Sequence, residues 1–398
     1  MRISTANSYA TSLQTLMERQ TKLGDTQEQL TSGKRVNRAS DDPAAAARAE
    51  RAYAAEKRAT ASQRAVDASD NAMTLTEAAL GDAGSLLQQV REALVAAGNA
   101  TYSDTERAGL ANQIADLRQQ LLSVANRSDG AGNHLFGGQS ASLAPFSDLP
   151  GGVQFLGAAG PTESASADAL PLTLDGRAAW MSARTGNGVF ETSALTSTGS
   201  AWIDAGRVTD PSAVTGSTYS IAFSVSGAST TYSVLKDGVA TAQTNVAFAP
   251  GQAVQIDGMS ASIAGQPADG DAFQLAPSAP AMSVFDALDK AIAELKTPNR
   301  TGTQIAQDNA MNLSNIDAVM NQLSAARSQV GATLNRVDAV TDRLSAQKLS
   351  SQTERRNAED LDMTQAISDF SAQQTGYDAA LKAYSMVQRL SLFNYINS

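Results

Sequence analysis

The 398-residue sequence contains no cysteine and a single histidine, His134. Without cysteine there are no disulfides, thiolate metal sites or cysteine nucleophiles, and one histidine cannot build a histidine-rich metal site. A serine triad would have to use His134, yet no Gly-x-Ser-x-Gly elbow accompanies it. We interpret His134 as a structural residue of a glycine-rich loop. These absences predict a protein that is not an enzyme and that uses no metal or cofactor.

Positive charge and long apolar runs are also scarce. The formal net charge is −10, which disfavours binding to nucleic acid because phosphates require clustered Lys and Arg. No run of about 18 apolar residues is present, so no membrane span is expected. The N-terminal residues have no apolar stretch of signal-peptide length. The lack of cysteine also suits a chain that crosses an export channel unfolded, where stray thiols could cross-link.

Proline is missing from two long stretches, 44–144 and 299–398, whereas ten of the 11 prolines fall within 145–298. Glycine shows the same bias, with 20 of 29 glycines within 130–270. Because proline breaks helices and both residues mark turns, this distribution predicts two helical arms around a β-rich insert. The expected fold is mainly α, with a long antiparallel helical rod formed by both termini and a small β domain looped out in the middle.

Capping signals locate the helices of both arms. Asp42 before Pro43 is a typical helix start, Ser103 and Glu106 form a capping box, and Ser283 precedes a third start. The predicted helices cover about 7–30, 43–98, 104–130, 284–297 and the stretch from 303 onward, with a polar lapse in the apolar pattern at 348–359.

Residues near the C-terminus that are apolar except for Gln374 recur at alternating spacings of 4 and 3: Met363, Ile367, Phe370, Gln374, Tyr377, Leu381 and Tyr384. A sustained average of 3.5 residues predicts a coiled-coil seam, which requires a partner helix. The expected partner is the N-terminal arm, where leucines recur every seven residues. An ordinary packed amphipathic tail helix is the alternative interpretation. The predicted assembly interface consists of Leu16, Leu23, Leu30, Met363, Ile367, Phe370, Tyr377, Leu381, Tyr384, Leu392 and Phe393.

The insert changes to a two-residue period, as in the alternating stretch 219–225. Asp237-Gly238 and Asp257-Gly258 are hairpin-turn dipeptides. Apolar residues expected to line one β core are Val254, Ile256, Ala261, Ile263, Phe273 and Leu275. Three domains are therefore predicted: a terminal coiled-coil core domain of 1–40 and 350–398, a helical rod domain of 41–140 and 282–349, and a β-rich outer insert of 141–281.

Two stretches resemble the signatures of the flagellin superfamily. The sequence LTSGKRVN at 30–37, followed by ASDDPA at 39–44, is similar to the N-terminal signature. The sequence ARSQVGA at 326–332, followed by NRVD at 335–338, is similar to the C-terminal signature. The residues that carry the resemblance are Gly33, Arg35, Asp41, Asp42, Pro43, Arg327, Gly331, Asn335 and Arg336.

Within this superfamily, the opening MRIST and the ending LSLFNYI resemble the hook–filament junction branch. The resemblance implies a structural subunit that forms a ring and joins the hook, through the first hook-associated protein, to the flagellin filament. It also implies export in an unfolded state through the flagellar type III apparatus, with a dedicated export chaperone and no cleaved signal peptide. The expected location is extracellular, in the bacterial flagellum. Filament flagellin and, less favoured, a secreted coiled-coil adhesin remain the alternatives.

Overall fold

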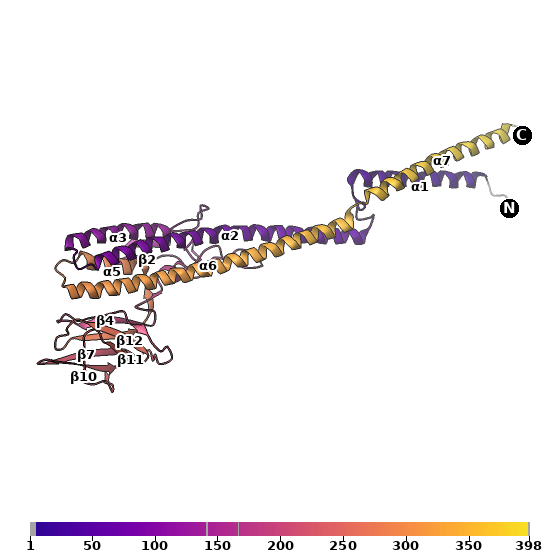
Figure 1. Cartoon of the computed structure of the whole chain (residues 1–398). Coiled ribbons are helices and arrows are strands. Elements are labelled where there is room, and N and C mark those ends of the chain that lie inside the picture. Colours follow the sequence, from indigo (N-terminus) through magenta and orange to yellow (C-terminus); the bar gives the residue numbers. More distant parts are fainter. Residues whose placement is uncertain (1–4, 141, 166, 397–398) are drawn as a thin grey trace. The chain divides into compact units, whose positions relative to one another are not determined.

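A computed structural model describes the backbone of residues 5–140, 142–165 and 167–396 and the side chains of residues 10–140, 142–165 and 167–386. The chain divides into two compact units, Met1–Arg64 with Val340–Ser398 and Ala65–Ala339. The predicted fold class is confirmed, because both terminal arms are helical and the strands are confined to the middle of the chain (Figure 1).

The first unit is built from antiparallel helix pairs. Helix α1 (Thr5–Ser32) lies beside α7 (Met363–Ile396), so that the two terminal helices run in opposite directions (Figure 1). The long helices α2 (Pro43–Ala97) and α6 (Gly302–Glu359) begin or end in this unit and continue into the second. In the first unit, Gln352 Nε2 of α6 donates to Glu56 Oε1 of α2 at 2.8 Å, which ties these two helices together.

The predicted helix starts are confirmed by their caps. Asp42 Oδ1 accepts from the Ala45 amide at 3.0 Å at the start of α2, and Ser103 forms a reciprocal capping box with Glu106 at the start of α3 (Asp104–Ala125). Ser283 caps α5 (Val284–Lys296). Each such cap satisfies amides that have no partner within the helix.

The predicted end of the third helix, near Gly130, is wrong. Helix α3 ends at Ala125, and the next residue, Asn126, turns its side-chain amide toward Phe146. Asn126 Nδ2 donates to the Phe146 carbonyl and Asn126 Oδ1 accepts from the Phe146 amide, both at 2.9 Å. A tertiary contact therefore ends the helix before the glycine that seemed to mark its end.

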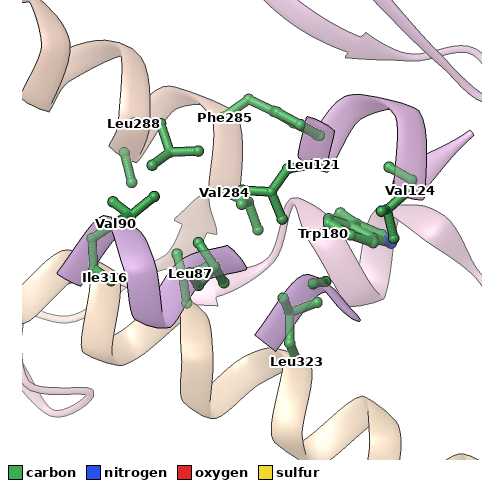
Figure 2. Packing of buried hydrophobic residues seen from close by; sticks show 14 of the residues in the cluster. Leu87, Val90, Leu121, Val124, Trp180, Val284, Phe285, Leu288, Ile316 and Leu323 are labelled. Carbon is green, nitrogen blue, oxygen red and sulfur yellow. The ribbon is translucent and has the colours of Figure 1, made fainter. Parts of the chain in front are cut away.

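The second unit has a helical core formed by α2, α3, α5 and α6. Figure 2 shows Leu87 of α2, Leu121 of α3 and Ile316 of α6 converging on one buried cluster. Trp180, at the end of the short helix α4 (Gly176–Trp180), stacks on Phe285 of α5 with ring centroids 6.1 Å apart. Each fully buried side chain of this size stabilises the fold by about 1.5–3 kcal/mol.

The β-rich region of the second unit contains a core of its own. One sheet has the order β10-β8-β7-β13-β4, with β9 beside β8, and a second has the order β11-β12-β5, with β6 beside β12. The predicted β core is confirmed, because all six predicted residues are buried in one cluster to which both sheets contribute. The two predicted hairpin turns are confirmed as well: Asp237-Gly238 joins β8 to β9 and Asp257-Gly258 joins β11 to β12, with positive φ throughout.

The strands have the following bounds: β1 Phe146–Leu149, β2 Gly152–Phe155, β3 Ala183–Arg184, β4 Phe190–Thr196, β5 Trp202–Ile203, β6 Arg207–Val208, β7 Tyr219–Ser226, β8 Ser229–Lys236, β9 Val239–Ala240, β10 Val246–Ala247, β11 Ala253–Ile256, β12 Met259–Ala264, β13 Ala272–Pro277 and β14 Pro280–Met282. Strands β1 and β2 form a separate hairpin, and β3 pairs with β14.

Candidate assembly surface

The face of α1 that meets α7 is the one that carries the heptad leucines. Leu16 is buried, and Leu23 and Leu30 are half-buried. Thr26, one turn from Leu30, is also buried, and its Oγ1 donates to Gln373 Oε1 of α7 at 3.0 Å. The N-terminal half of the predicted seam thus faces the other terminal helix within the same chain.

The face of α7 that meets α1 shares Phe370, Tyr377 and Tyr384 with the predicted seam but otherwise lies one residue before the predicted positions. Ala366 is buried and Gln373 bonds to Thr26, whereas the seam had been predicted to pass through the next residue in each case. A Cβ built on Gly376 would lie 2.8 Å from Arg19 Nη1, so the glycine leaves room for that guanidinium. Buried or half-buried residues with spacings of 4, 3, 4, 3 and 4 along this face are Ala366, Phe370, Gln373, Tyr377, Ala380 and Tyr384.

A second face of α7 remains open in the monomer. Met363, Ile367 and Leu381 are 45%, 55% and 49% exposed. Large exposed apolar side chains at seam spacing are typical of an interaction surface. We call these three residues the outer seam, and the buried or half-buried face of α7 the inner seam.

Three aromatic residues, Phe370, Tyr377 and Tyr384, belong to both spacings and are half-buried. Helix α7 can therefore pack against one helix through its inner seam and against a further helix through its outer seam. The predicted interface residues Leu392 and Phe393 belong to α7, of which only the backbone is described at these positions. Their side chains lie outside the described residues.

The N-terminal signature residues gather in the connector between α1 and α2. Gly33 has a φ of 70°, which favours glycine, and ends α1. Arg35 Nη1 donates to Asp42 Oδ2 at 3.2 Å, next to Pro43 at the start of α2.

Two carboxylates brace this connector. The Asp41 carboxylate accepts from the amides of Arg38 and Asn37, and these bonds lower its pKa, the Arg38 amide most of all. The pKa of Asp42 is also lowered, chiefly by the Ala45 amide and then by Arg35. Both groups therefore act as cap and turn acceptors, as the sequence predicted.

The C-terminal signature residues lie along α6. Arg327 Nε donates to Glu77 Oε1 of α2 at 2.7 Å, and Arg336 donates to the backbone carbonyl of Asp168. Gly331 is half-buried and Asn335 is exposed. The two arginines hold α6 against its neighbours in the second unit, whereas the structure gives no contact that explains Gly331 or Asn335.

The side chains best suited to catalysis or metal binding are His134 and the carboxylates. His134 Nδ1 lies 2.8 Å from the Asn126 carbonyl, which fits a structural role in its loop. Within 10–140, 142–165 and 167–386, where side chains are described, no group of three or more His, Asp or Glu side chains is placed to hold a metal ion. Within the same part of the chain, no helix combines the length and apolar character needed to cross a bilayer.

Two family models match this chain. The bacterial flagellin N-terminal helical region matches residues 3–141, and the bacterial flagellin C-terminal helical region matches residues 313–396. Together these matches cover more than half of the chain, including both terminal helices and both signatures. The chain belongs to the bacterial flagellin family.

Within that family, the chain is similar to flagellar hook-associated protein 3 of Escherichia coli (strain K12), with 26% identity over 398 residues and 99% of each chain covered. The crystal structure of the Xanthomonas campestris protein FlgL has a TM-score of 0.67 at 28% identity, covering 76% of this chain and 98% of that one. The crystal structure of the flagellar junction protein FlgL from Legionella pneumophila has a TM-score of 0.63 at 26% identity, covering 70% and 95%.

These relationships make the protein a structural component of the bacterial flagellum, in the hook-associated group, with a role in motility. Its partners are accordingly flagellar. The relatives are structural proteins rather than enzymes.

Proposed function

We propose that this protein joins the flagellar hook, through the first hook-associated protein, to the flagellin filament. The main support for the proposal is the share of the chain over which the similarity to hook-associated protein 3 extends. The flagellin family models match only the arms, up to residue 141 and from residue 313. The similarity to hook-associated protein 3 continues through the β-rich middle and covers 99% of both chains. The Legionella pneumophila relative is known as a flagellar junction protein.

The two seams of α7 suggest how the subunit assembles. The inner seam pairs with α1 of the same chain, while the outer seam of Met363, Ile367 and Leu381 would pack against neighbouring subunits of a ring. These side chains are about half exposed, so burying the rest of each would contribute about half of the 1.5–3 kcal/mol that complete burial provides. In this proposal Leu392 and Phe393 continue the same interface, and flagellin and the first hook-associated protein pack against the two sides of the ring.

The three-domain division predicted from the sequence belongs to the same proposal. The terminal coiled-coil domain, 1–40 and 350–398, would form the core of the assembly, and the helical rod domain, 41–140 and 282–349, would surround it. The β-rich insert, 141–281, would face outward except for its first part, which contributes Phe146 and Trp180 to the helical core.

An exposed apolar seam also needs protection before assembly. We propose that the chain is exported unfolded through the flagellar type III apparatus without a cleaved signal peptide and reaches the extracellular part of the flagellum. A flagellar export chaperone would cover the α7 segment until then, because an open apolar strip favours unwanted association.

The test is the double variant Ile367→Asp/Leu381→Asp, which places charge in the outer seam only. A matched control, Ser368→Asp/Ala379→Asp, adds the same charge at exposed positions of α7 away from both seams. Burying an unpaired carboxylate is strongly unfavourable, so assembly should fail for the outer-seam variant and survive in the control.

The expected phenotype of the outer-seam variant is a cell with hooks but no filaments that releases flagellin into the medium. The purified variant should melt within about 2 °C of the wild type, because exposed substitutions change the free energy of unfolding little. Normal filaments in cells that carry this variant would contradict the proposed interface. Abundance of this protein along the whole sheared filament would instead identify it as the filament flagellin.

A further inference from the structure

Helices α6 and α7 are separated by an interruption that the local sequence does not require. Only Asp360, Leu361 and Asp362 lie between them, and neither proline nor glycine is present. Proline and glycine are the residues that usually break a helix from within. The break therefore depends on groups that contact these residues from elsewhere in the chain.

Backbone groups at the break are bonded to a different part of the chain. In a continuous helix, the Ala358 and Glu359 carbonyls would accept from the amides four residues further on. Instead, Arg35 Nη2 donates to the Ala358 carbonyl at 2.9 Å and the Arg35 amide donates to the Glu359 carbonyl at 2.7 Å. Both donors belong to the connector between α1 and α2.

The connector also takes a donor from the break. The Leu361 amide, which would donate to Asn357 in a continuous helix, donates to the Gly33 carbonyl at 3.0 Å. Lys34 Nζ adds an ion pair of 3.2 Å to Glu359 Oε2. The signature residues Gly33 and Arg35 thus replace helical partners of α6 with their own backbone and side-chain groups.

We propose that the connector holds α6 and α7 apart, and that releasing it lets residues 302–396 form one continuous helix. In that fused state the direction in which each face of α7 points would be set by its continuity with α6 alone. The inner seam would then no longer face α1. The connector is then a conformational device that couples one terminus to the geometry of the other. This inference concerns the single chain and does not depend on the proposed junction role.

One local feature favours the break independently of the connector. Asp362 Oδ1 accepts from the amides of Thr364 and Gln365 at 3.0 and 3.1 Å, as an N-cap does. The experiment must therefore separate this cap from the connector.

Because the chain has no cysteine, Asn357→Cys/Thr364→Cys provides two unique sites for nitroxide labels, both at exposed positions. In a continuous helix these Cα atoms, seven residues apart, would lie about 10 Å apart on nearly the same face. The releasing variant is Gly33→Val/Arg35→Ala. Because a Cβ at Gly33 meets no atom within 4 Å, valine acts there through the backbone, which it drives out of the left-handed region.

Dipolar broadening in the labelled full-length protein measures the distance between the two labels. In the releasing variant this distance should change from its value with an intact connector to one narrow population near the helical separation of about 10 Å. Asp362→Ala should keep the wild-type value, because the connector remains. Gly24→Val should keep it too, since that glycine also has free space but lies within α1.

Three outcomes would overturn the proposal. An unchanged separation in Gly33→Val/Arg35→Ala would mean that the break is intrinsic to 360–362. A broad distribution would mean that the connector only keeps α7 folded. Fusion in Asp362→Ala alone would assign the break to the local cap.

Discussion

Thr26 of α1 donates a hydrogen bond of 3.0 Å to Gln373 of α7, although 347 positions separate the two residues in the sequence. Thr26 is buried on the face of α1 that meets the inner seam of α7, whose members other than Gln373 are small or aromatic. A single polar contact within an apolar seam typically fixes the register of two helices at some cost in stability. We expect this pair to align the two termini.

Replacing Thr26 with valine keeps the shape of the side chain but removes the bond. The free energy of opening of the α1/α7 pair should fall by about 0.5–1.5 kcal/mol, the typical net contribution of one hydrogen bond. Amide hydrogen exchange across residues 366–380 measures this opening. Thr21→Val is the matched control, because Thr21 lies on the same helix, its hydroxyl donates to the carbonyl four residues before it within α1, and its side chain is exposed. Equal amide protection in the two variants would show that the Thr26 hydrogen bond does not set the register of α1 and α7.

The helical core of the second unit should be sensitive to lost volume. Leu87 is fully buried in the cluster of Figure 2, so Leu87→Ala should lower the free energy of unfolding by about 2–5 kcal/mol. Leu349→Ala removes the same atoms from an exposed position of α6 and should change stability by less than about 0.5 kcal/mol. Denaturant unfolding measures both, and similar losses in the two variants would contradict the assigned core.

Acid should weaken the ion pair between buried Arg118 and exposed Asp148 in the second unit. Arg118 is buried, and its Nη1 lies 2.7 Å from Asp148 Oδ2 of the β1–β2 hairpin. The hydrogen bond from Arg118 is the main reason that the pKa of Asp148 lies below its usual range. A depressed pKa in the folded state gives stability that is present above the unfolded pKa, about 4, and is lost as the pH falls through the folded value.

Asp148→Asn should therefore be less stable than the wild type at pH 7, and the difference should shrink steadily below about pH 4. Thermal unfolding over this pH range measures the effect. A difference between the two proteins that stays constant with pH would show that Asp148 contributes by packing rather than by charge.

Asp286 should behave in the opposite way. Partial desolvation raises the pKa of Asp286, although the residue as a whole is exposed; repulsion from Asp289 adds to this, and Arg118 partly offsets both. Because the folded state then binds the proton more tightly than the unfolded state, the ionised carboxylate lowers stability at neutral pH. Asp286→Asn should raise the melting temperature at pH 7, and this gain should disappear as the pH falls below about 4. If Asp286→Asn were less stable than the wild type at pH 7, the assigned desolvation cost of the Asp286 carboxylate would be contradicted.

Local signals made much of the fold predictable from the sequence. The caps at Asp42, Ser103 and Ser283 each act within one helical turn, so they could be recognised without tertiary information. The same is true of the Asp-Gly hairpin turns. The end of α3 could not be predicted, because the contact that ends it joins Asn126 to Phe146, 20 residues away.

The assembly surface could be predicted only in part. Apolar periodicity identified the outer seam of α7, and the leucines of α1 were recognised by the same rule. Half of the inner seam was missed, because Ala366, Gln373 and Ala380 are not apolar enough to stand out, although they repeat the same spacing one residue before the predicted positions. The flagellin signatures located Gly33 and Arg35, but their bonds to Ala358 and Leu361 depend on the meeting of two distant segments.

The most direct test of the junction role is the position of this protein along the intact flagellum. Val239 is 70% exposed in the β-rich region, so Val239→Cys offers the chain's only thiol for a maleimide–gold label. Flagella from cells with the unmodified protein give the background. Electron microscopy should show gold confined to a single position, the boundary between hook and filament. Gold along the full length of the filament, or none above background on flagella while the labelled protein lies elsewhere, would contradict the proposal.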